Sequence, residues 1–291
     1  MQKDTTIVAY GEEEEDFYLH HQYRTKPFER TSHVHRTYEI YYQILGQRNY
    51  FIKDRTYPVG PGDLVFVDKY EVHKASDCGP PGQERIVLNF SDGYACANGG
   101  LLPPEVFELF RARPPVYRMK PQEQIFAQSL FDKMTREIVR KEPGFEAYLR
   151  ILLIELLLFS SRLMRSRTAP EDGKPNAVHQ KVSRIVQHIN EHYSEPLSLR
   201  ETARLFHLSP YYVSRTFKEV TGFTFVEYVN LTRIKEAQRL LRETNGKIIE
   251  IAAAVGMENI GHFDRTFKKI TKMTPFGYRK MHRQQRGQAS R

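Results

Sequence analysis

The spacing of apolar residues predicts strands in the first third of the chain. Between Phe17 and Phe90, short β-branched or aromatic runs such as YEIYYQIL, RNYFIK and DLVFV are separated by Gly, Pro and Asp. These runs lack the three-to-four-residue period of an amphipathic helix. Several short strands with turns between them predict a small β-barrel or sandwich.

Helical spacing follows in the middle of the chain. Phe126, Leu130 and Met134 recur every four residues, and residues 148–159 are apolar nearly all round. Such a wide apolar face needs a partner surface. Either a second copy of the chain or the chain's own β-domain could provide that surface, and the sequence leaves both open.

A polar stretch rich in Pro and Gly, RSRTAPEDGKPNAVHQ, predicts an interdomain linker, and helical patterns then run almost to the end. We therefore predict an α+β protein in four segments. These are a β-domain (1–103), a helical dimerisation segment (104–165), a linker (166–180) and an all-α domain (181–291).

The charge is divided unevenly along the chain. Residues 175–291 carry 20 Lys and Arg against 10 Asp and Glu, a net +10, which leaves −1 for residues 1–174 of a chain whose total is +9. A basic domain attached to a near-neutral one indicates that only one of the two meets a polyanion.

Cysteine content and the N-terminal sequence favour a cytoplasmic protein. Cys78 and Cys96 are too few for a disulfide framework. The N-terminus lacks the basic-then-apolar order of a secretory signal. The most apolar stretch, residues 149–164, is interrupted by charged residues and is too short to span a bilayer.

The tetrapeptide RTFK occurs twice, at residues 215–218 and 265–268. Around each copy the pattern is a short helix, a turn and a second helix. Ser209 followed by Pro210 predicts the start of the first of these second helices, and Asn259 predicts the start of the other. The all-α domain is therefore predicted to contain two helix-turn-helix units.

In each predicted second helix the repeated Phe faces inward, and the Arg and Lys face solvent. An arginine there can bind guanine bidentately, and a lysine can neutralise a phosphate. Residues 224–244 between the copies form a helical stripe about 30 Å long. That length approaches the ~34 Å repeat of B-DNA, so the two units could enter successive segments of the major groove.

The stretch from Val182 to Lys280 resembles the DNA-binding domain of AraC/XylS-type transcription regulators. The residues that carry the resemblance are Ala203, Leu208, Ser209, Arg215, Phe217, Lys218, Gly222, Arg233, Ala237, Leu240, Leu241, Glu250, Ile251, Ala252, Val255, Gly256, Phe263, Arg265, Phe267, Lys268, Thr274, Pro275, Tyr278 and Arg279. Departures are Lys272, where the family usually has Gly, and Met257, where it usually has Phe.

The resemblance implies which residues contact DNA. In the first unit the base contacts fall on Tyr211, Ser214 and Arg215, and we add Lys218 as a phosphate contact. The corresponding residues of the second unit are Ile260, Gly261, His262, Asp264 and Arg265, with Lys268 added. Gly261 offers no side chain and Asp264 repels phosphate, although its carboxylate could accept from a cytosine amino group. We therefore expect the second unit to discriminate bases less sharply.

A second constellation lies in the β-domain. His33, His35 and Glu39 would share one face of a strand, because side chains alternate along it. If the DLVFV strand runs back beside the first, His73 joins them, and three imidazoles with one carboxylate suit a first-row divalent metal. Three interpretations stay open: a metal site, polar residues lining an effector pocket together with Tyr41, and core packing.

This constellation resembles the two motifs of the cupin superfamily, although Asp68 stands where the second motif usually has Pro. The sensing domains of AraC-type regulators are commonly cupin-like. The resemblance implies a small-molecule effector, often a sugar or related metabolite, and no required cofactor. Tyr38, Tyr42, Tyr50 and Phe51 are further candidates for an aromatic pocket lining.

We therefore expect an N-terminal cupin-like β-barrel with added helices and an all-α domain with two helix-turn-helix units joined by a long helix. The expected function is sequence-specific regulation of transcription, as an activator that responds to an effector. The expected partners are double-stranded DNA, RNA polymerase and a second copy of the chain, with no membrane and no catalysis. The alternative is a cupin dioxygenase or isomerase using His33, His35, Glu39 and His73.

Overall fold

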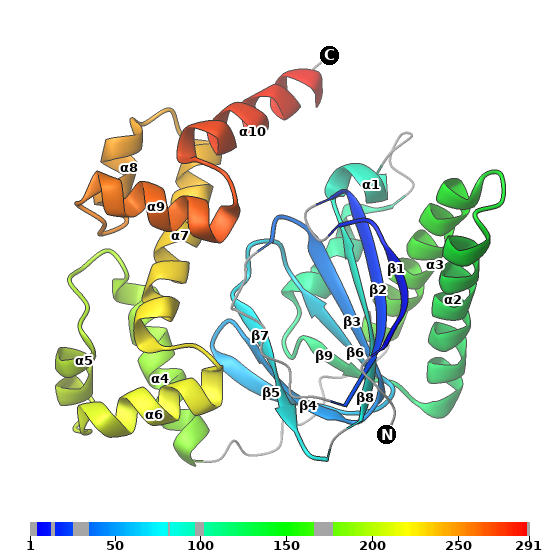
Figure 1. Ribbon diagram of the computed structural model, residues 1–291, viewed down its shortest axis with the longest axis horizontal. Coiled ribbons are helices and arrows are strands. Elements are labelled where there is room, and N and C mark those ends of the chain that lie inside the picture. Colours follow the sequence, from blue (N-terminus) through cyan, green and yellow to red (C-terminus); the bar gives the residue numbers. More distant parts are fainter. Residues whose placement is uncertain are drawn as a thin grey trace.

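The computed structural model describes residues 5–12, 15–25, 35–80, 82–96, 102–165 and 177–289. Figure 1 shows two parts: a β-domain flanked by helices on one side, and an all-helical domain on the other side. The α+β class and the order of the two parts are confirmed.

The larger sheet has six strands in the order β1-β2-β8-β3-β6-β9, each antiparallel to its neighbours. Along the chain they are β1 (Thr5–Tyr10), β2 (Phe17–Arg24), β3 (Tyr38–Leu45), β6 (Asp63–Val67), β8 (Gln83–Phe90) and β9 (Val116–Arg118). The DLVFV strand, β6, runs back beside β3, which is the condition under which His73 was expected to join the polar residues of the first strand, and Val67 lies opposite Glu39.

The smaller sheet has the order β5-β4-β7. Its strands are β4 (Gln47–Ile52), β5 (Arg55–Val59) and β7 (His73–Cys78). Tyr50 and Tyr57 of this sheet share one buried cluster with Tyr41, Val65 and Val87 of the larger sheet. The two sheets therefore face each other across a common interior, which makes a cupin-like barrel that is not fully closed.

Helices cover the outer face of the larger sheet. They are α1 (Asp92–Cys96), the 3₁₀ helix η1 (Pro104–Arg111), α2 (Pro121–Arg140) and α3 (Phe145–Arg165). Alternation along β3 explains the contact: Ile40 and Tyr42 point toward the helices, and Tyr42 stacks on Phe131 with ring centroids 5.0 Å apart. The chain's own sheet thus covers one face of α3, while Tyr148 and Ile151 on that helix stay exposed.

The C-terminal domain is helical throughout its described length. Its helices are α4 (Ala177–His192), α5 (Leu199–Leu205), α6 (Pro210–Thr221), α7 (Phe225–Glu243), α8 (Ile248–Ala254), α9 (Ile260–Thr271) and α10 (Pro275–Ala289). The first half of α7 lies in one apolar core with α4, α5 and α6, and its second half lies in another with α8, α9 and α10. No helix in the described part of the chain combines the length and the apolar character that crossing a bilayer requires.

Candidate nucleic-acid interface and ligand pocket

The first helix-turn-helix unit consists of α5 and α6. The Ser209 hydroxyl accepts a hydrogen bond from the Tyr212 amide at 3.2 Å, and Pro210 occupies the first turn of α6. Gly222, with a φ of +76°, ends the helix in the left-handed conformation that glycine adopts most readily. The predicted start of this helix is therefore confirmed.

One face of α6 is buried and the opposite face is open. Val213 and Phe217 are fully buried, as predicted, whereas Tyr211, Ser214, Arg215 and Lys218 are exposed. These four side chains and Glu219 line a shallow surface groove. The Arg215 Nε donates to Glu219 at 2.8 Å, and both side chains are more than half exposed. An ion pair in that setting is weak, so Arg215 can exchange Glu219 for another partner at little cost.

The second unit, α8 and α9, repeats this construction. Asn259 accepts from the His262 amide at 2.8 Å, which confirms the predicted N-cap, and Phe263 and Phe267 are fully buried. The outward set is exposed apart from Gly261, which is half-buried. It comprises Ile260, Gly261, His262, Asp264, Arg265 and Lys268. Several of these residues line a second groove together with the apolar Ile249 and Phe276.

Helix α7 connects the two units. It begins in a capping box, where the Thr224 hydroxyl accepts from the Glu227 amide at 3.2 Å and the Glu227 carboxylate accepts from the Thr224 amide at 2.8 Å. Its 19 residues correspond to about 28 Å. Phe225 and Tyr228 belong to the first core, and Ile234 and Leu241 belong to the second. Helix α7 is therefore a strut that packs against α6 in its first half and against α9 in its second half.

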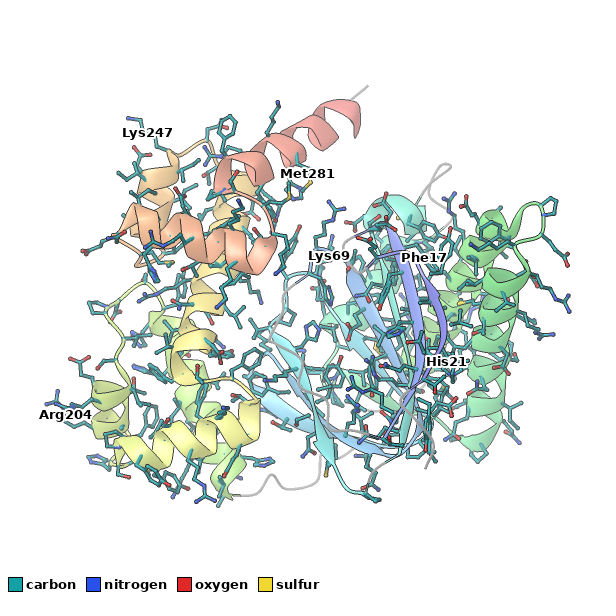
Figure 2. All side chains as sticks on the ribbon, in the orientation of Figure 1. Phe17, His21, Lys69, Arg204, Lys247 and Met281 are labelled. Atoms are coloured by element: carbon teal, nitrogen blue, oxygen red, sulfur yellow. The ribbon has the colours of Figure 1, made fainter. Side chains whose placement is uncertain are left out.

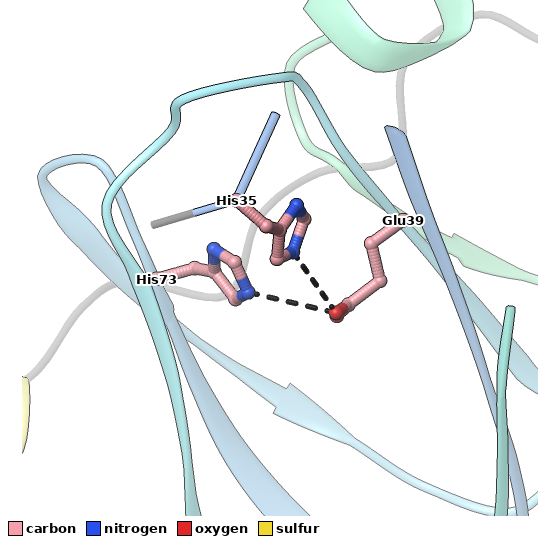
Figure 3. Close-up of side chains that lie close together, drawn as sticks. All are labelled: His35, Glu39 and His73. Carbon is pink, nitrogen blue, oxygen red and sulfur yellow. Dashed lines mark hydrogen bonds and ion pairs between the residues drawn. The ribbon is translucent and has the colours of Figure 1, made fainter. Parts of the chain in front are cut away.

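The β-domain brings three of the four predicted polar residues together (Figure 3). His35, Glu39 and His73 are buried, and their potential ligand atoms lie within 4.8 Å of one another. The Nε2 atoms of His35 and His73 lie 3.3 and 3.6 Å from Glu39 Oε2. His33 lies outside the described residues.

Hydrogen bonds fix the orientation of this triad. The Nδ1 atoms of His35 and His73 each lie 2.8 Å from a backbone carbonyl oxygen, of Thr37 and Glu71 respectively. Each Nδ1 therefore donates, and each Nε2 is directed toward Glu39. The Tyr50 hydroxyl donates to the other oxygen of Glu39.

Electrostatics keep the carboxylate of Glu39 charged. Burial alone would raise its pKa, but His73 and His35 hold the pKa well below its ordinary value. Burial and the neighbouring Glu39 raise the pKa of Tyr50 well above its usual range, so this phenol keeps its proton. His35, His73 and Tyr50 therefore surround one charged carboxylate in the buried interior of the barrel.

The aromatic candidates divide between three places. Tyr41 and Tyr50 lie in the barrel interior with ring centroids 5.0 Å apart, whereas Tyr38 and Tyr42 face the outer helices. Phe51 faces the helical domain. The alternation of side chains along β3 separates Tyr41 from Tyr38 and Tyr42.

Asn89 is a further buried residue beside this triad, and the sequence prediction did not include it. It is fully buried, lies opposite Glu39 in the β3–β8 register and places its Nδ2 3.4 Å from His35 Nε2. The sequence contains a pattern that could have identified this residue. Asn89 is a polar residue in the otherwise apolar end of the strand QERIVLNF, two positions after the inward-facing Val87.

The triad also fits a divalent metal ion. Two imidazole nitrogens and a carboxylate oxygen are ligands that first-row metals accept. A metal-bound histidine ordinarily donates its other ring N–H to a carbonyl or carboxylate, and both Nδ1 atoms here lie at that distance from a carbonyl. Tyr50 supplies the further hydrogen bond that orients the carboxylate.

Both parts of the chain match models of known protein families. Residues 16–157 match the model of the AraC-like ligand binding domain, and residues 202–281 match a helix-turn-helix domain model. A bifunctional transcriptional activator and DNA repair enzyme, AdaA of Bacillus subtilis, is 40% identical over 100 residues, which are 34% of this chain and 47% of that protein. The chain spans less than half the length of the first curated relatives it matches.

Other similarities extend over most of the chain. The transcriptional activator RhaR of Cronobacter sakazakii is 23% identical over 254 residues, covering 84% of both chains. The structure of ToxT from Vibrio cholerae with bound unsaturated fatty acid aligns with 96% of this chain and 97% of that chain, at 14% identity and a TM-score of 0.39. The two family models match the chain in the same order as the two parts of the structure: the ligand-binding model covers the β-domain and its helices, and the helix-turn-helix model covers the C-terminal helical domain.

Proposed function

Because the chain belongs to the AraC family of DNA-binding transcription regulators, with a ligand-binding domain in front of its DNA-binding domain, we propose that it is an activator controlled by a small-molecule effector. One observation carries the proposal. Helices α6 and α9 both pack against α7 and each exposes one face, with Arg215 and Arg265 at equivalent positions. We further propose that the protein is cytoplasmic, acts as a homodimer and contacts RNA polymerase. The metalloenzyme alternative is not favoured, because it gives the duplicated helical units no purpose.

The proposed DNA contacts divide into two kinds. Arg215 and Arg265 read bases, assisted by Tyr211 and Ser214 in the first unit. Lys218 and Lys268 contact phosphates and set the salt dependence of binding. Ile260, Gly261, His262 and Asp264 complete the second reading face.

The proposed effector site is the barrel interior around His35, Glu39, Tyr41 and His73, with His33 as a further member. A sugar or related metabolite suits this interior, because hydroxyl groups can donate to Glu39 while the ring lies against Tyr41 or Tyr50. A divalent ion held by His35, Glu39 and His73 would add a Lewis acid that binds an effector hydroxyl.

Selection of bound duplexes from a random pool tests the proposal, with and without candidate sugars. We expect one enriched site of two parts separated by about one helical turn. Specific proteins of this kind bind their site roughly 10³–10⁷-fold more tightly than unrelated DNA. Equal recovery of all sequences would contradict the proposal.

The effector site has its own test. Glu39→Gln keeps the shape of the side chain but removes its charge, so the variant should lose any shift in DNA affinity that an effector produces in the parent protein. Metal analysis of the purified protein and of this variant decides the metal question. A stoichiometric ion in the parent that is lost in Glu39→Gln supports the site, and a parent without bound metal after exposure to Zn²⁺ or Mn²⁺ contradicts it.

A further inference from the structure

The loop between β6 and β7, residues 68–72, forms hydrogen bonds with both His35 and His73. The backbone amide of Tyr70 donates to the carbonyl oxygen of His35 at 2.9 Å. The carbonyl oxygen of Glu71 accepts from His73 Nδ1 at 2.8 Å. The pocket thus fixes the backbone of this loop at two consecutive residues.

Tyr70 adopts a conformation that its side chain disfavours. Its φ is +59°, in the left-handed region where residues with a β-carbon are uncommon. Such a conformation persists only where the surroundings enforce it. The hydrogen bond to His35 on one side and contacts to the helical domain on the other supply that enforcement.

The same loop contacts the helical domain through its side chains. The Arg242 guanidinium lies over the Tyr70 ring, 4.1 Å from its centroid, and Arg242 also donates to the Tyr278 hydroxyl at 2.8 Å. The Glu71 carboxylate accepts from Lys235 Nζ at 2.8 Å. Val72 is buried in the apolar core of the first helix-turn-helix unit.

These contacts follow one face of α7. Tyr228, Lys235 and Arg242 are spaced seven residues apart, so they lie on the same side of the helix. Tyr228 donates to the carbonyl oxygen of Lys53, and the Phe51 ring lies 5.9 Å from the Tyr228 ring. The β-domain is therefore docked along the whole length of the strut that carries both reading helices.

Further contacts reach beyond α7 to both units. The Lys74 ammonium donates to the carbonyl oxygen of Gly222, the residue that ends α6. Arg36, next to His35, approaches the sulfur of Met281 on α10 at 3.2 Å. Figure 2 shows Met281 and Lys69 of the β6–β7 loop on the facing sides of the two domains.

We propose that the β6–β7 loop is an interdomain latch, through which the state of the His35–Glu39–His73 pocket controls the docking of α7. The proposal rests on the proposed function, in which this pocket receives the effector. A ligand that draws His35 or His73 toward itself alters the hydrogen bonds to Tyr70 and Glu71. Tyr70 then leaves its enforced conformation, and the loop loosens its contacts with Arg242 and Lys235.

The separation of the domains, measured without DNA or effector, tests the latch. Spin labels on Gln122→Cys in α2 and Glu258→Cys beyond α8, in the full chain with Cys78→Ser and Cys96→Ser, report this separation. We expect one narrow distance distribution in the parent and a broad one after Tyr70→Ala. His73→Ala should also broaden it, because the bond to Glu71 is lost. Val65→Ala changes a residue of the same barrel that is as buried as His73, so it is the matched control for His73→Ala, and its distance distribution should stay narrow.

Charge exchange guards against a variant that merely fails to fold. Glu71→Lys should broaden the distribution, and adding Lys235→Glu should narrow it again. A broad distribution in the parent, or narrow distributions in Tyr70→Ala, His73→Ala and Glu71→Lys, would overturn the latch. Since the measurement involves no DNA, absence of sequence-specific binding would instead contradict the proposed function and leave this result standing.

Discussion

The two helix-turn-helix units share a scaffold and differ on the surface they present. Both helices, α6 and α9, have a side-chain N-cap and a buried Phe in the repeated RTFK. The outward-facing positions differ between the two helices. Gly261 and Asp264 of the second unit stand where the first unit has Tyr211 and Ser214. The packing positions are therefore alike in the two units, whereas the outward positions differ.

The ends of the two helices differ as well. Gly222 ends α6 with a φ of +76°, and Lys272 ends α9 with a φ of +60°. The same left-handed turn is thus made by a residue suited to it in one unit and by a less suited residue in the other. The first unit therefore has both the fuller reading face and the more favourable helix end.

Truncating the repeated phenylalanines should have the largest effect. Phe217→Ala and Phe267→Ala should each lower the free energy of unfolding by about 3–5 kcal/mol, because each removes a fully buried ring. Denaturant unfolding measures this loss, and Phe217→Leu and Phe267→Leu are the conservative controls. A loss below about 1 kcal/mol in only one unit would show that the two scaffolds are not equivalent.

The packing that this prediction tests was readable from the sequence. Val213, Phe217, Phe263 and Phe267 follow a helical period, and local capping residues mark the helix ends. The same logic identified β3, β4 and β6 and joined His35, Glu39 and His73. Local pattern was sufficient for residues packed within one helical unit, and for the triad it needed the further condition that β6 runs back beside β3.

Other features depend on contacts that no local pattern encodes. Strands β1 and β9 were not predicted, because both are edge strands defined by pairing with β2 and β6, and β9 has only three residues. Phe51 and Val72 look like ordinary core residues of a strand and its flank, yet they pack against the helical domain. Sequence spacing gives the face of a strand but does not say which domain covers it.

Replacing each arginine by alanine should show how the two helix-turn-helix units differ in base recognition. Arg215→Ala should cost about 1–3 kcal/mol on the selected site and relax the preference at one base. Arg265→Ala should change base preference less, because Gly261 and Asp264 offer fewer specific contacts. Binding titrations on single-base variants of the site measure both effects, and Arg162→Ala in α3 is a control expected to leave binding unchanged. An equal loss on every sequence in Arg215→Ala would remove its base-reading role.

The lysines should act alike in both units. Lys218→Ala and Lys268→Ala should each weaken binding to all duplexes by a similar factor and reduce the salt slope by about 1. Titrations at several salt concentrations measure the slope. A loss confined to one sequence would contradict the phosphate role, and a normal slope in one variant would show that its lysine does not reach the backbone.

Exchanging the helix ends should give the smallest effect. Lys272→Gly should raise the free energy of unfolding by about 0.5–1 kcal/mol, since glycine tolerates the left-handed conformation. Gly222→Ala should lower it by a similar amount, and its added methyl group would meet the Lys74 side chain. Thermal unfolding of both variants measures the pair. Destabilisation by Lys272→Gly would mean that the lysine side chain contributes more than its backbone conformation costs.

We predict that the first unit reads the base sequence and that the second mainly holds the protein in register on the DNA. A scan of every single-base change across the selected two-part site, measured as Kd in the parent and in Arg215→Ala, tests this claim most directly. The half-site whose penalties shrink in Arg215→Ala is the one read by α6. We expect each mismatch to cost about 1–3 kcal/mol at several positions of that half-site and clearly less in the other half. Equal penalties in the two halves, or larger ones opposite α9, would contradict it.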